Sequence, residues 1–414
     1  MPQSPVILVI GTGDTKAPEL MCLRETILAK GGKALMMDVG VVGEPEFEPE
    51  IRKEDVAAAA GHSIPDLIAM EDENSSMAAM AEGAATLAGQ LHAEGRIDGM
   101  VALGGTMGTD LAFDVALALP IGVPKMVISS VAYSHLIPPE RIAADLMMIL
   151  WAGGLWGVNS ISRAVLEQAA GAVIGACRPA GPARFDKPAV AISALGQASL
   201  KYMKRVESEL SLRGYDVIVF HAVGIGGRAM ESLIAQDAFV AVLDLTLIEV
   251  SDDALGSCVS GGESRLRTAG RKGLPQIVAP GAIDGLDFAT WAGIPPGSEG
   301  QDTHAHNRLI SVAKMTIEQR RKSAEEIVAR LKGATGPLRF ILPVKGFDEW
   351  DREGGPLHDA EGHAVQVEVF RAGVKAENRV EIDAHINDDI FAETVLKEFD
   401  TMVQDGHVPQ GKPE

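Results

Sequence analysis

The sequence of 414 residues has little cysteine and no long apolar run. Its three cysteines stand in apolar or small-residue surroundings with no close pair, which supports neither a disulfide framework nor a zinc site. No apolar run reaches the roughly 18 residues of a membrane-spanning helix, and the first residues lack the basic cluster of a signal peptide. We therefore expect a cytoplasmic protein with no membrane partner and no structural metal.

Basic side chains are also scarce relative to acidic ones. Lysine and arginine number 37 against 57 aspartates and glutamates, so the formal net charge is −20. A surface this acidic repels nucleic acid and anionic membranes. We expect no nucleic-acid partner, and we expect instead a nucleotide or a small anionic metabolite held in a local cationic pocket.

Short aliphatic runs alternate with longer helical patterns along the whole chain. This alternation is typical of βαβ units around mainly parallel sheets, and 414 residues exceed one ordinary core. The proline-rich stretch 177–188, CRPAGPARFDKP, marks a domain boundary. The predicted fold class is therefore α/β, with two Rossmann-like, doubly wound subdomains at 1–178 and 188–414 and a cleft between them.

The hydrophobic pattern also places the individual elements. In the first half we predict strands at 6–10, 33–42, 99–103 and 125–130, and helices at 18–30, 75–94, 110–119 and 160–174. In the second half we predict strands within 189–196, 215–227, 239–249, 275–281 and 338–346, and helices ending at 212 and spanning 228–235, 263–272, 306–331 and 389–403.

The turn GTGDTK at residues 11–16 lies between a predicted strand and a predicted helix. Glycines let backbone N–H groups approach an anion, the helix start adds positive partial charge, and threonine hydroxyls and Lys16 can complete a phosphate cradle. The turn is neither a Walker A loop nor a dinucleotide fingerprint, because Lys16 occupies the third small position of the latter. A tight turn with a helix cap from Asp14 or Thr15 is the alternative.

Two further glycine-rich turns follow predicted strands. The stretch LGGTMGTDL at 103–111 is a second candidate anion cradle, and a capped turn is again the alternative. The stretch HAVGIGGRAME at 221–231 places Gly224, Gly226 and Ala229 at the three small positions of the dinucleotide pattern, with Asp244 about 20 residues on. A bound dinucleotide is therefore an alternative ligand.

Four residues of the second half are candidates for acid–base work and anion binding. His221 ends a strand beside the Gly224 turn, and a hydrogen-bonded core histidine is its alternative reading. Glu263 and Arg265 follow two glycines at a predicted helix start, where they could clamp a carboxylate or phosphate or simply cap a solvated helix. His306 lies near a second histidine, but no third metal ligand is identifiable. A loop with surface histidines is therefore the alternative to a metal-binding loop. Together they define a second hypothesis, an enzyme acting on a small phosphorylated or carboxylated metabolite.

Other enzyme classes lack support in the sequence. It contains no Gly-x-Ser-x-Gly elbow and no His-Glu-x-x-His helix, so neither a serine hydrolase nor a zincin is indicated.

Several long motifs, in order along nearly the whole chain, resemble the Tm-one-like ATP-binding domain family of bacteria and fungi, which also forms the N-terminal part of a plant tobamovirus-resistance protein. The motifs are IGTGDTKAPEL at 10–20, GGTMGT at 104–109, NSISRAVLEQAA at 159–170, GRKGLPQIVAPGAIDGLDF at 270–288 and LPVKGFDEWD at 342–351. The resemblance implies two Rossmann-like subdomains, ATP binding and a homodimer, but no agreed reaction.

The resemblance also implies the residues of the phosphate site. It places the cradle on Gly11, Thr12, Asp14, Thr15 and Lys16, with Gly104, Gly105, Thr106 and Thr109 adjoining. A magnesium ion is expected to accompany the polyphosphate, with Asp14 reaching its water shell. The chain departs from the family pattern within 132–159, which bears on ligand identity. A pure interaction module is a third hypothesis, which the many polar residues at strand ends disfavour.

Overall fold

The computed structural model describes residues 4–177 and 186–413, which form two compact units. Unit 1 covers the chain up to residue 184 and unit 2 begins at residue 185. Residues 178–185 of the expected linker lie outside the described residues. Both large sheets are parallel throughout, which confirms the expected α/β class with mainly parallel sheets.

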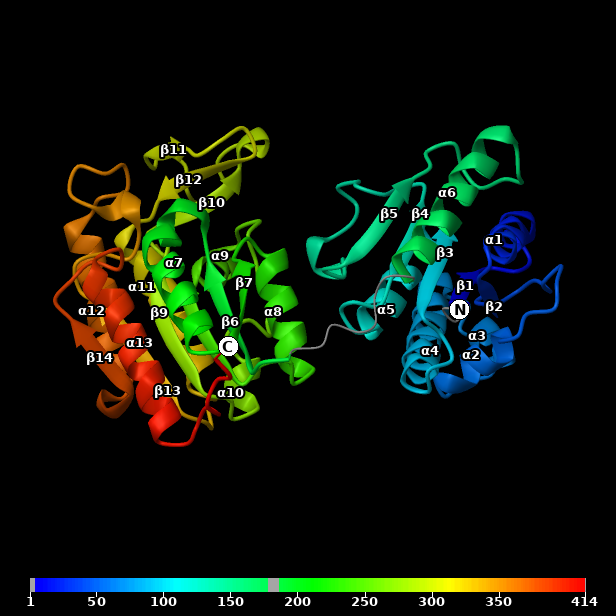
Figure 1. The fold of residues 1–414 in the computed structure, drawn as a ribbon. Coiled ribbons are helices and arrows are strands. Elements are labelled where there is room, and N and C mark those ends of the chain that lie inside the picture. Colours follow the sequence, from blue (N-terminus) through cyan, green and yellow to red (C-terminus); the bar gives the residue numbers. More distant parts are fainter. Residues whose placement is uncertain (1–3, 178–185, 414) are drawn as a thin grey trace. The chain divides into compact units, whose positions relative to one another are not determined.

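Unit 1 is built on one five-stranded sheet with the order β2-β1-β3-β4-β5 (Figure 1). The strands are β1 (Val6–Gly11), β2 (Lys33–Asp38), β3 (Gly99–Gly104), β4 (Lys125–Ser129) and β5 (Leu146–Leu150). The helices are α1 (Ala17–Ala29), α2 (Lys53–Ala59), α3 (Ile64–Ala69), α4 (Glu73–Ala93), α5 (Thr106–Ala118) and α6 (Ser160–Cys177), with a short 3-10 turn η1 (Pro139–Arg141).

Both faces of this sheet are buried by helices. Because side chains alternate along a strand, Ile7 and Val9 of β1 face α1 and α6, whereas Leu8 and Ile10 face the layer that contains α4 and α5. All four side chains are at most 1% exposed. Strands buried on both faces read as continuous aliphatic runs, which explains why they were predictable.

Unit 2 contains a six-stranded parallel sheet with the order β14-β13-β9-β8-β6-β7. The strands are β6 (Ala189–Ala194), β7 (Asp216–His221), β8 (Ala241–Thr246), β9 (Gln276–Gly281), β13 (Leu338–Pro343) and β14 (Arg379–Ile382). One face packs on α7 (Gly196–Leu212) and α13 (Asp389–Gln404). The other face is covered chiefly by α8 (Ile225–Ala235), α9 (Ile248–Leu255), α11 (Ile317–Leu331) and α12 (Ala360–Gly373), near the short α10 (Thr268–Arg271).

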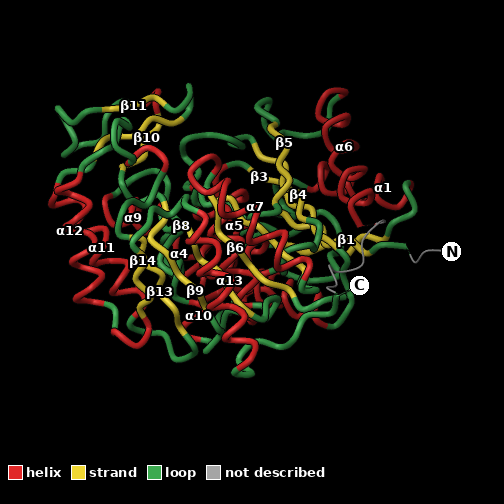
Figure 2. The backbone as a smooth tube through the Cα atoms, turned by 60° about the vertical axis from the view of Figure 1, so that its left-hand side comes forward, coloured by secondary structure: helices red, strands yellow, loops and turns green. Residues whose placement is uncertain are grey.

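A small antiparallel sheet extends unit 2. It consists of β10 (Gly285–Ala289), β12 (Ile310–Lys314) and β11 (Thr303–Ala305), paired in that order. In the view of Figure 2, β10 and β11 lie above β13 and β14 of the large sheet. The 3-10 turns η2 (Thr290–Ala292), η3 (Glu349–Asp351) and η4 (Ala376–Asn378) complete the unit.

Two helix predictions in unit 2 are wrong. The expected helix 306–331 begins only at Ile317, because Thr316 and Gln319 form a capping box there and residues 310–314 pair with β10 as a strand. Of the expected helix 263–272, only residues 268–271 are helical. Leu266 adopts a left-handed conformation with φ of 66°, which interrupts a right-handed helix.

Several other elements were not predicted at all. They are the edge strands β5 and β14, the small antiparallel sheet, and the helices α2, α3, α9 and α12. The predicted strand 33–42 ends at Asp38, whose Oδ1 accepts a hydrogen bond from the Gly40 amide at 2.9 Å and so closes a turn. No helix within the described ranges is both long and apolar enough to cross a bilayer.

Gly104 allows β3 to meet α5 at close range. A Cβ atom there would lie 2.5 Å from the Cα of Gly108, a backbone contact that cannot be relieved by a side-chain rotation. We expect Gly104→Ala to lower the free energy of unfolding of unit 1 by about 1–3 kcal/mol. Gly89→Ala in α4, which would meet only ordinary contacts, should instead be neutral or stabilising by up to about 1 kcal/mol. Urea unfolding of both variants tests this pair, and equal effects would contradict it.

Candidate functional site

The strand order of unit 1 creates a crevice between β1 and β3. The chain runs from β1 to β2 on one side and later returns to β3 on the other, so the loops after β1 and β3 diverge at the carboxyl edge. Ligands of open α/β sheets bind at such switch points. A cavity of about 620 Å³ lies here, and residues of both predicted turns line it together. They include Gly11, Thr12, Asp14, Thr15 and Lys16 from the first turn and Gly104, Gly105 and Thr106 from the second.

The first turn is anchored to the end of β2. The Gly13 amide donates to Asp38 Oδ1 at 2.8 Å, and the hydroxyls of Thr12 and Thr15 are hydrogen-bonded at 2.6 Å. Asp38 is 1% exposed, and burial raises the pKa of its carboxyl above the ordinary value, with the nearby Asp14 adding to the effect. Asp38 therefore holds the shape of the turn.

Two helices begin at this cavity without a side-chain cap. Neither Lys16, at the start of α1, nor Gly105, at the start of α5, provides a capping hydrogen bond. In α5 the first amide that bonds back is that of Thr109, to the Gly105 carbonyl at 2.9 Å, and the first turn carries no acidic residue. Uncapped first-turn amides and the helix dipole together favour an anion at this end of α5.

Two predicted residues are engaged with other parts of unit 1. The Lys16 ammonium donates to the Leu155 carbonyl at 2.7 Å and lies 4.8 Å from the ring centre of Trp156, whose side chain is 91% exposed. Thr109 is 1% exposed, and its hydroxyl pairs with that of Ser129 at 2.7 Å. Thr109 thus links the second turn to the end of β4 and does not line the cavity.

The remaining lining of the cavity contains both apolar and acidic residues. Val39, Val41, Leu67 and Met77 are among the apolar lining residues. The acidic lining residues are Asp14, Glu71, Asp72 and Glu73. Lys16 is the one basic residue among the described residues that line this cavity.

Unit 2 repeats this arrangement at its own switch point. The chain leaves β6 for β7 on one side and returns to β8 on the other, and a cavity of about 170 Å³ lies at the carboxyl ends of these strands. His221 and His306, two of the four candidate acid–base residues, line it. Both side chains are exposed, and the His306 ring packs 5.4 Å from that of Trp350.

The other two candidate residues are placed elsewhere. Glu263 is exposed and does not line the cavity. Arg265 is fully buried, where its guanidinium pairs with Asp244 and, at 2.7 Å, with Glu249. Arg265 therefore neutralises carboxylates of the protein and is not positioned to clamp an anionic substrate.

The dinucleotide alternative meets a similar obstacle. The amides of Gly224 and Gly227, at the start of α8, both donate to Glu249 Oε1. Asp244, the residue that would contact a ribose, is ion-paired with Arg265. Because a buried carboxylate already occupies the place of the pyrophosphate, this turn serves the fold.

The sequence reasoning missed three aspartates of the unit 2 cavity. Asp284, Asp287 and Asp348 line it, in the motifs AIDGLD and KGFDEWD that follow β9 and β13. Burial raises the pKa of Asp348 to about 6 and that of Asp287 to about 7, with Asp348 adding to the effect on Asp287. Burial and the neighbouring Asp348 raise the pKa of Asp284 well above its ordinary value. Their positions after consecutive parallel strands were the available signal.

No grouping of three or more histidine, cysteine, aspartate or glutamate side chains suited to a metal ion occurs among the described residues.

Fold and cavities define the class: a protein of two Rossmann-like α/β units, each with a cavity at the carboxyl edge of its parallel sheet. Residues 5–181 match the N-terminal domain, and residues 187–403 the C-terminal domain, of the Uncharacterised protein family (UPF0261). The chain belongs to the UPF0261 family.

Relatives span the whole chain. A UPF0261 protein of Brucella melitensis is 49% identical over 409 residues, which cover 99% of this chain and 98% of that protein. The ToMV susceptible protein tm-1(GCR26) of Solanum lycopersicum is 29% identical over 430 residues, which cover 98% of this chain and 57% of that protein. The family membership implied by the motifs is thus confirmed.

Among solved structures, a UDP-N-acetylglucosamine 2-epimerase covers 100% of this chain and is itself covered to 99%, with 10% identity and a TM-score of 0.23. A likeness this weak carries no argument about function.

The raised pKa values make the stability of unit 2 depend on pH. A carboxyl group whose pKa is higher in the folded than in the unfolded state binds more protons when folded, so stability falls as pH rises from about 4 to about 7. We expect Asp287→Asn to remove part of this dependence and to stabilise unit 2 by about 1–2 kcal/mol at neutral pH. Urea unfolding at several pH values, with amide exchange in β9 and β13 to report on unit 2, measures the effect. An unchanged pH slope would contradict it.

Proposed function

We propose that unit 1 binds ATP in the cavity between the loops after β1 and β3. The observation that carries the proposal is the meeting of two uncapped helix starts, those of α1 and α5, at the switch point of the sheet in one cavity of about 620 Å³. Backbone amides at helix starts are the commonest phosphate-binding device of such folds, and the volume lies within the usual range for ligand pockets.

The phosphates would lie at the start of α5, on Gly104, Gly105 and Thr106, and against the turn 11–16. This end of the cavity provides backbone amides and hydroxyls without an acidic first-turn residue on α5. The apolar residues Val41, Leu67 and Met77 provide a surface for the base. Gly105 is exposed and carries no side chain, so its backbone is open to a phosphate at this position.

Charge balance favours a nucleotide that carries magnesium. Four acidic residues and one lysine line the cavity, so a bare polyphosphate would meet net repulsion. Asp14 Oδ1 is buried and has no hydrogen-bond partner among the described residues, which suits a carboxylate that faces the water shell of a cation. Lys16 would add the one positive charge from the protein.

Gly105→Asp tests the role of the α5 start. A Cβ atom at Gly105 would have its nearest contact, Ser130 Oγ, at 3.9 Å, so a side chain is accommodated. Aspartate is a favourable cap and should raise stability by up to about 1 kcal/mol, while its charge excludes phosphate. We expect a more stable protein that has lost the increase in melting temperature produced by MgATP.

Gly105→Ala is the matched control, because it makes the same backbone change without the charge. It should retain most of the MgATP-induced shift. If Gly105→Asp kept the full shift of the unmodified protein, measured by differential scanning fluorimetry, phosphate binding at α5 would be excluded.

Lys16→Ala tests the cation. Lys16 supplies the only positive charge among the described lining residues, so its removal should weaken MgATP binding by about tenfold or more, the usual cost of a charged hydrogen bond. The fold should be retained, since the residue lies at the start of α1 and is partly exposed. Lys33→Ala, at an exposed lysine of β2 outside the cavity, serves as control. Equal affinities of the two variants for MgATP, measured by calorimetric titration, would contradict this role.

A further inference from the structure

The cavity of unit 2 has a charge opposite to that expected of an anion site. Its described lining residues include three aspartates and two histidines but no lysine or arginine. Arg265, the expected clamp, is buried against Asp244 and Glu249. A phosphorylated or carboxylated ligand would therefore meet carboxylates with no compensating cation, and this cavity does not suit the metabolites that the sequence led us to expect.

Asp284 has an unused hydrogen-bonding oxygen at this cavity. The residue is 2% exposed, yet its Oδ2 has no partner among the described residues. A buried carboxyl oxygen without a partner costs free energy comparable to that of a lost hydrogen bond, so such atoms mark places where a partner is missing. Because Asp284 lines the cavity, a ligand there can supply that partner.

The charges that surround Asp284 do not neutralise the group. Arg320 of α11 is the cation that lowers the pKa of Asp284, but its guanidinium lies 3.4 Å from Asp359 and donates to Gln366 at 3.1 Å. Asp348 and Asp351 act in the opposite direction and raise that pKa. Arg320 is thus shared with another carboxylate, and the cavity keeps an excess of acid.

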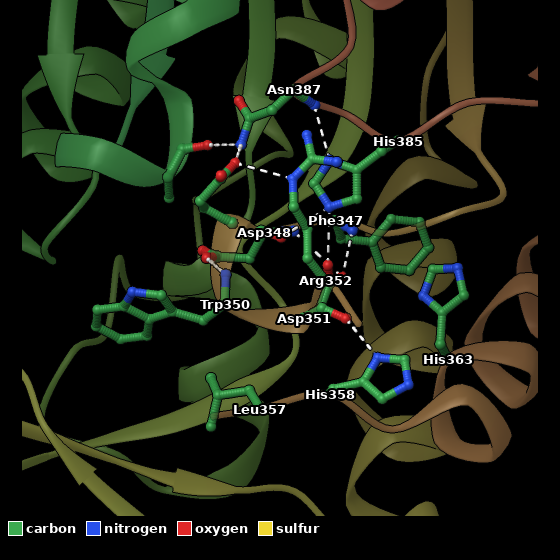
Figure 3. A network of polar contacts seen from close by, with 12 residues as sticks. Phe347, Asp348, Trp350, Asp351, Arg352, Leu357, His358, His363, His385 and Asn387 are labelled. Carbon is green, nitrogen blue, oxygen red and sulfur yellow. Dashed lines mark hydrogen bonds and ion pairs between the residues drawn. The ribbon is translucent and has the colours of Figure 1, made fainter. Parts of the chain in front are cut away.

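His385 is not among the described residues that line the cavity. Its Nδ1 accepts a hydrogen bond from the Asn387 amide at 3.1 Å, and its Nε2 lies 2.9 Å from Asp351 Oδ1. Both ring nitrogens are thus engaged by groups of the protein, and the ring lowers the pKa of Asp348 without contacting the cavity. Figure 3 shows His385, Asn387 and Asp351 in this network, with Asp348 on the same loop.

The remaining wall of the cavity is aromatic and apolar. The Trp350 ring is flanked by His304 at 5.0 Å and His306 at 5.4 Å, measured between ring centres. Val223, Ile248, Ile310, Val312 and Leu357 are among the apolar lining residues. An indole face attracts cations, and apolar walls favour an organic group over a hydrated metal ion.

We propose that the cavity of unit 2 is a binding site for a small organic ammonium ion. Asp284 accepts a hydrogen bond from the ammonium group, Asp287 and Asp348 add negative charge to the lining, and Trp350 lies against the carbon skeleton of the ligand. The volume of about 170 Å³ limits the ligand to a few carbon atoms. The site is separate from the nucleotide cavity of unit 1, and its argument does not depend on ATP binding.

A matched set of three-carbon probes tests the sign of the preferred charge. We would titrate the full chain with 1-amino-2-propanol, with 1,2-propanediol and with lactate, which present an ammonium group, a hydroxyl and a carboxylate on similar skeletons. The amine should bind at least about tenfold more tightly than the diol, because a charged hydrogen bond is worth more than a neutral one. Lactate should not bind. Equal or tighter binding of the diol or lactate would overturn the proposal, as would no binding of the amine.

Asp284→Asn locates the site. Removing the unpartnered buried carboxyl should leave the protein folded and weaken amine binding by about tenfold or more. Asp216→Asn, at an exposed aspartate at the opposite end of the sheet, should leave it unchanged. Unaltered amine affinity in folded Asp284→Asn would overturn the assignment. Asp284→Asn should keep its MgATP response and Gly105→Asp its amine binding, so failures of the two proposals are distinguishable.

The pH dependence gives an independent readout. Amine affinity should rise with pH between about 5 and 8 as Asp348 and Asp287, whose pKa values burial raises to about 6 and about 7, become ionised. The other titratable or charged groups near these carboxyls are Asp252, Asp284, Asp351, Glu349, Arg320, His385, His221, His306, Cys258 and Tyr202. An affinity that stayed flat or fell over this range would contradict binding to ionised aspartates.

Discussion

The reversal of chain direction next to the first strand of each sheet is the constraint on which both cavities depend. In unit 1 the loops after β1 and β3 must diverge, and in unit 2 the loops after β6 and β8 must do the same. The helices that follow cannot close over the gap, because they pack on opposite faces of the sheet. In unit 1, α1 lies on one face and α5 on the other, and in unit 2, α7 lies on one face and α9 on the other. In each unit the position of the cavity at this switch point therefore follows from topology, and the side chains that line it decide what it can hold.

The difference between a binding turn and a structural turn lies in what the rest of the chain places against the helix start. The start of α8 carries the better fingerprint, but Glu249 from α9 reaches its amides and Arg265 in turn neutralises Glu249. At α5 the N-cap residue is Gly105, which has no side chain to cap the first turn. A buried carboxylate paired with arginine mimics a bound anion closely enough to occupy such a site permanently. This occupant comes from 25 residues further along the chain, which no local pattern reveals.

Much of the fold, and the two glycine turns that line the cavity of unit 1, could be predicted from the sequence, for physical reasons that are specific to each element. Strands such as β1 and β3 are buried on both faces, so their aliphatic runs are unambiguous, and the glycine turns that follow them meet because parallel strands share a carboxyl edge. The prediction of a helix at 306–331 was wrong in its first part because strand β12 is stabilised by pairing with β10, a long-range contact. The same holds for Arg265, which we expected beside Glu263 as an anion clamp, with a solvated helix as the alternative, but which is buried by carboxylates distant in sequence. Asp284, Asp287 and Asp348 were missed since each stands alone in its motif and only the fold gathers them.

The two cavities differ in how the protein compensates its own acidity. The net charge of −20 means that an anionic ligand needs local help, and in unit 1 that help is structural: two helix starts and a single lysine, with acids nearby that a magnesium ion could satisfy. In unit 2 the negative charge of the buried carboxylates is only partly compensated by arginine. Arg265 and Arg320 are both buried and both committed to protein carboxylates, while Asp284 keeps an oxygen without a partner. A buried acid without a partner takes up a proton, as the raised pKa values of these aspartates reflect, or binds a cation, and the proposed ammonium ligand would replace that proton. One chain would then combine sites of opposite polarity on two sheets of the same topology.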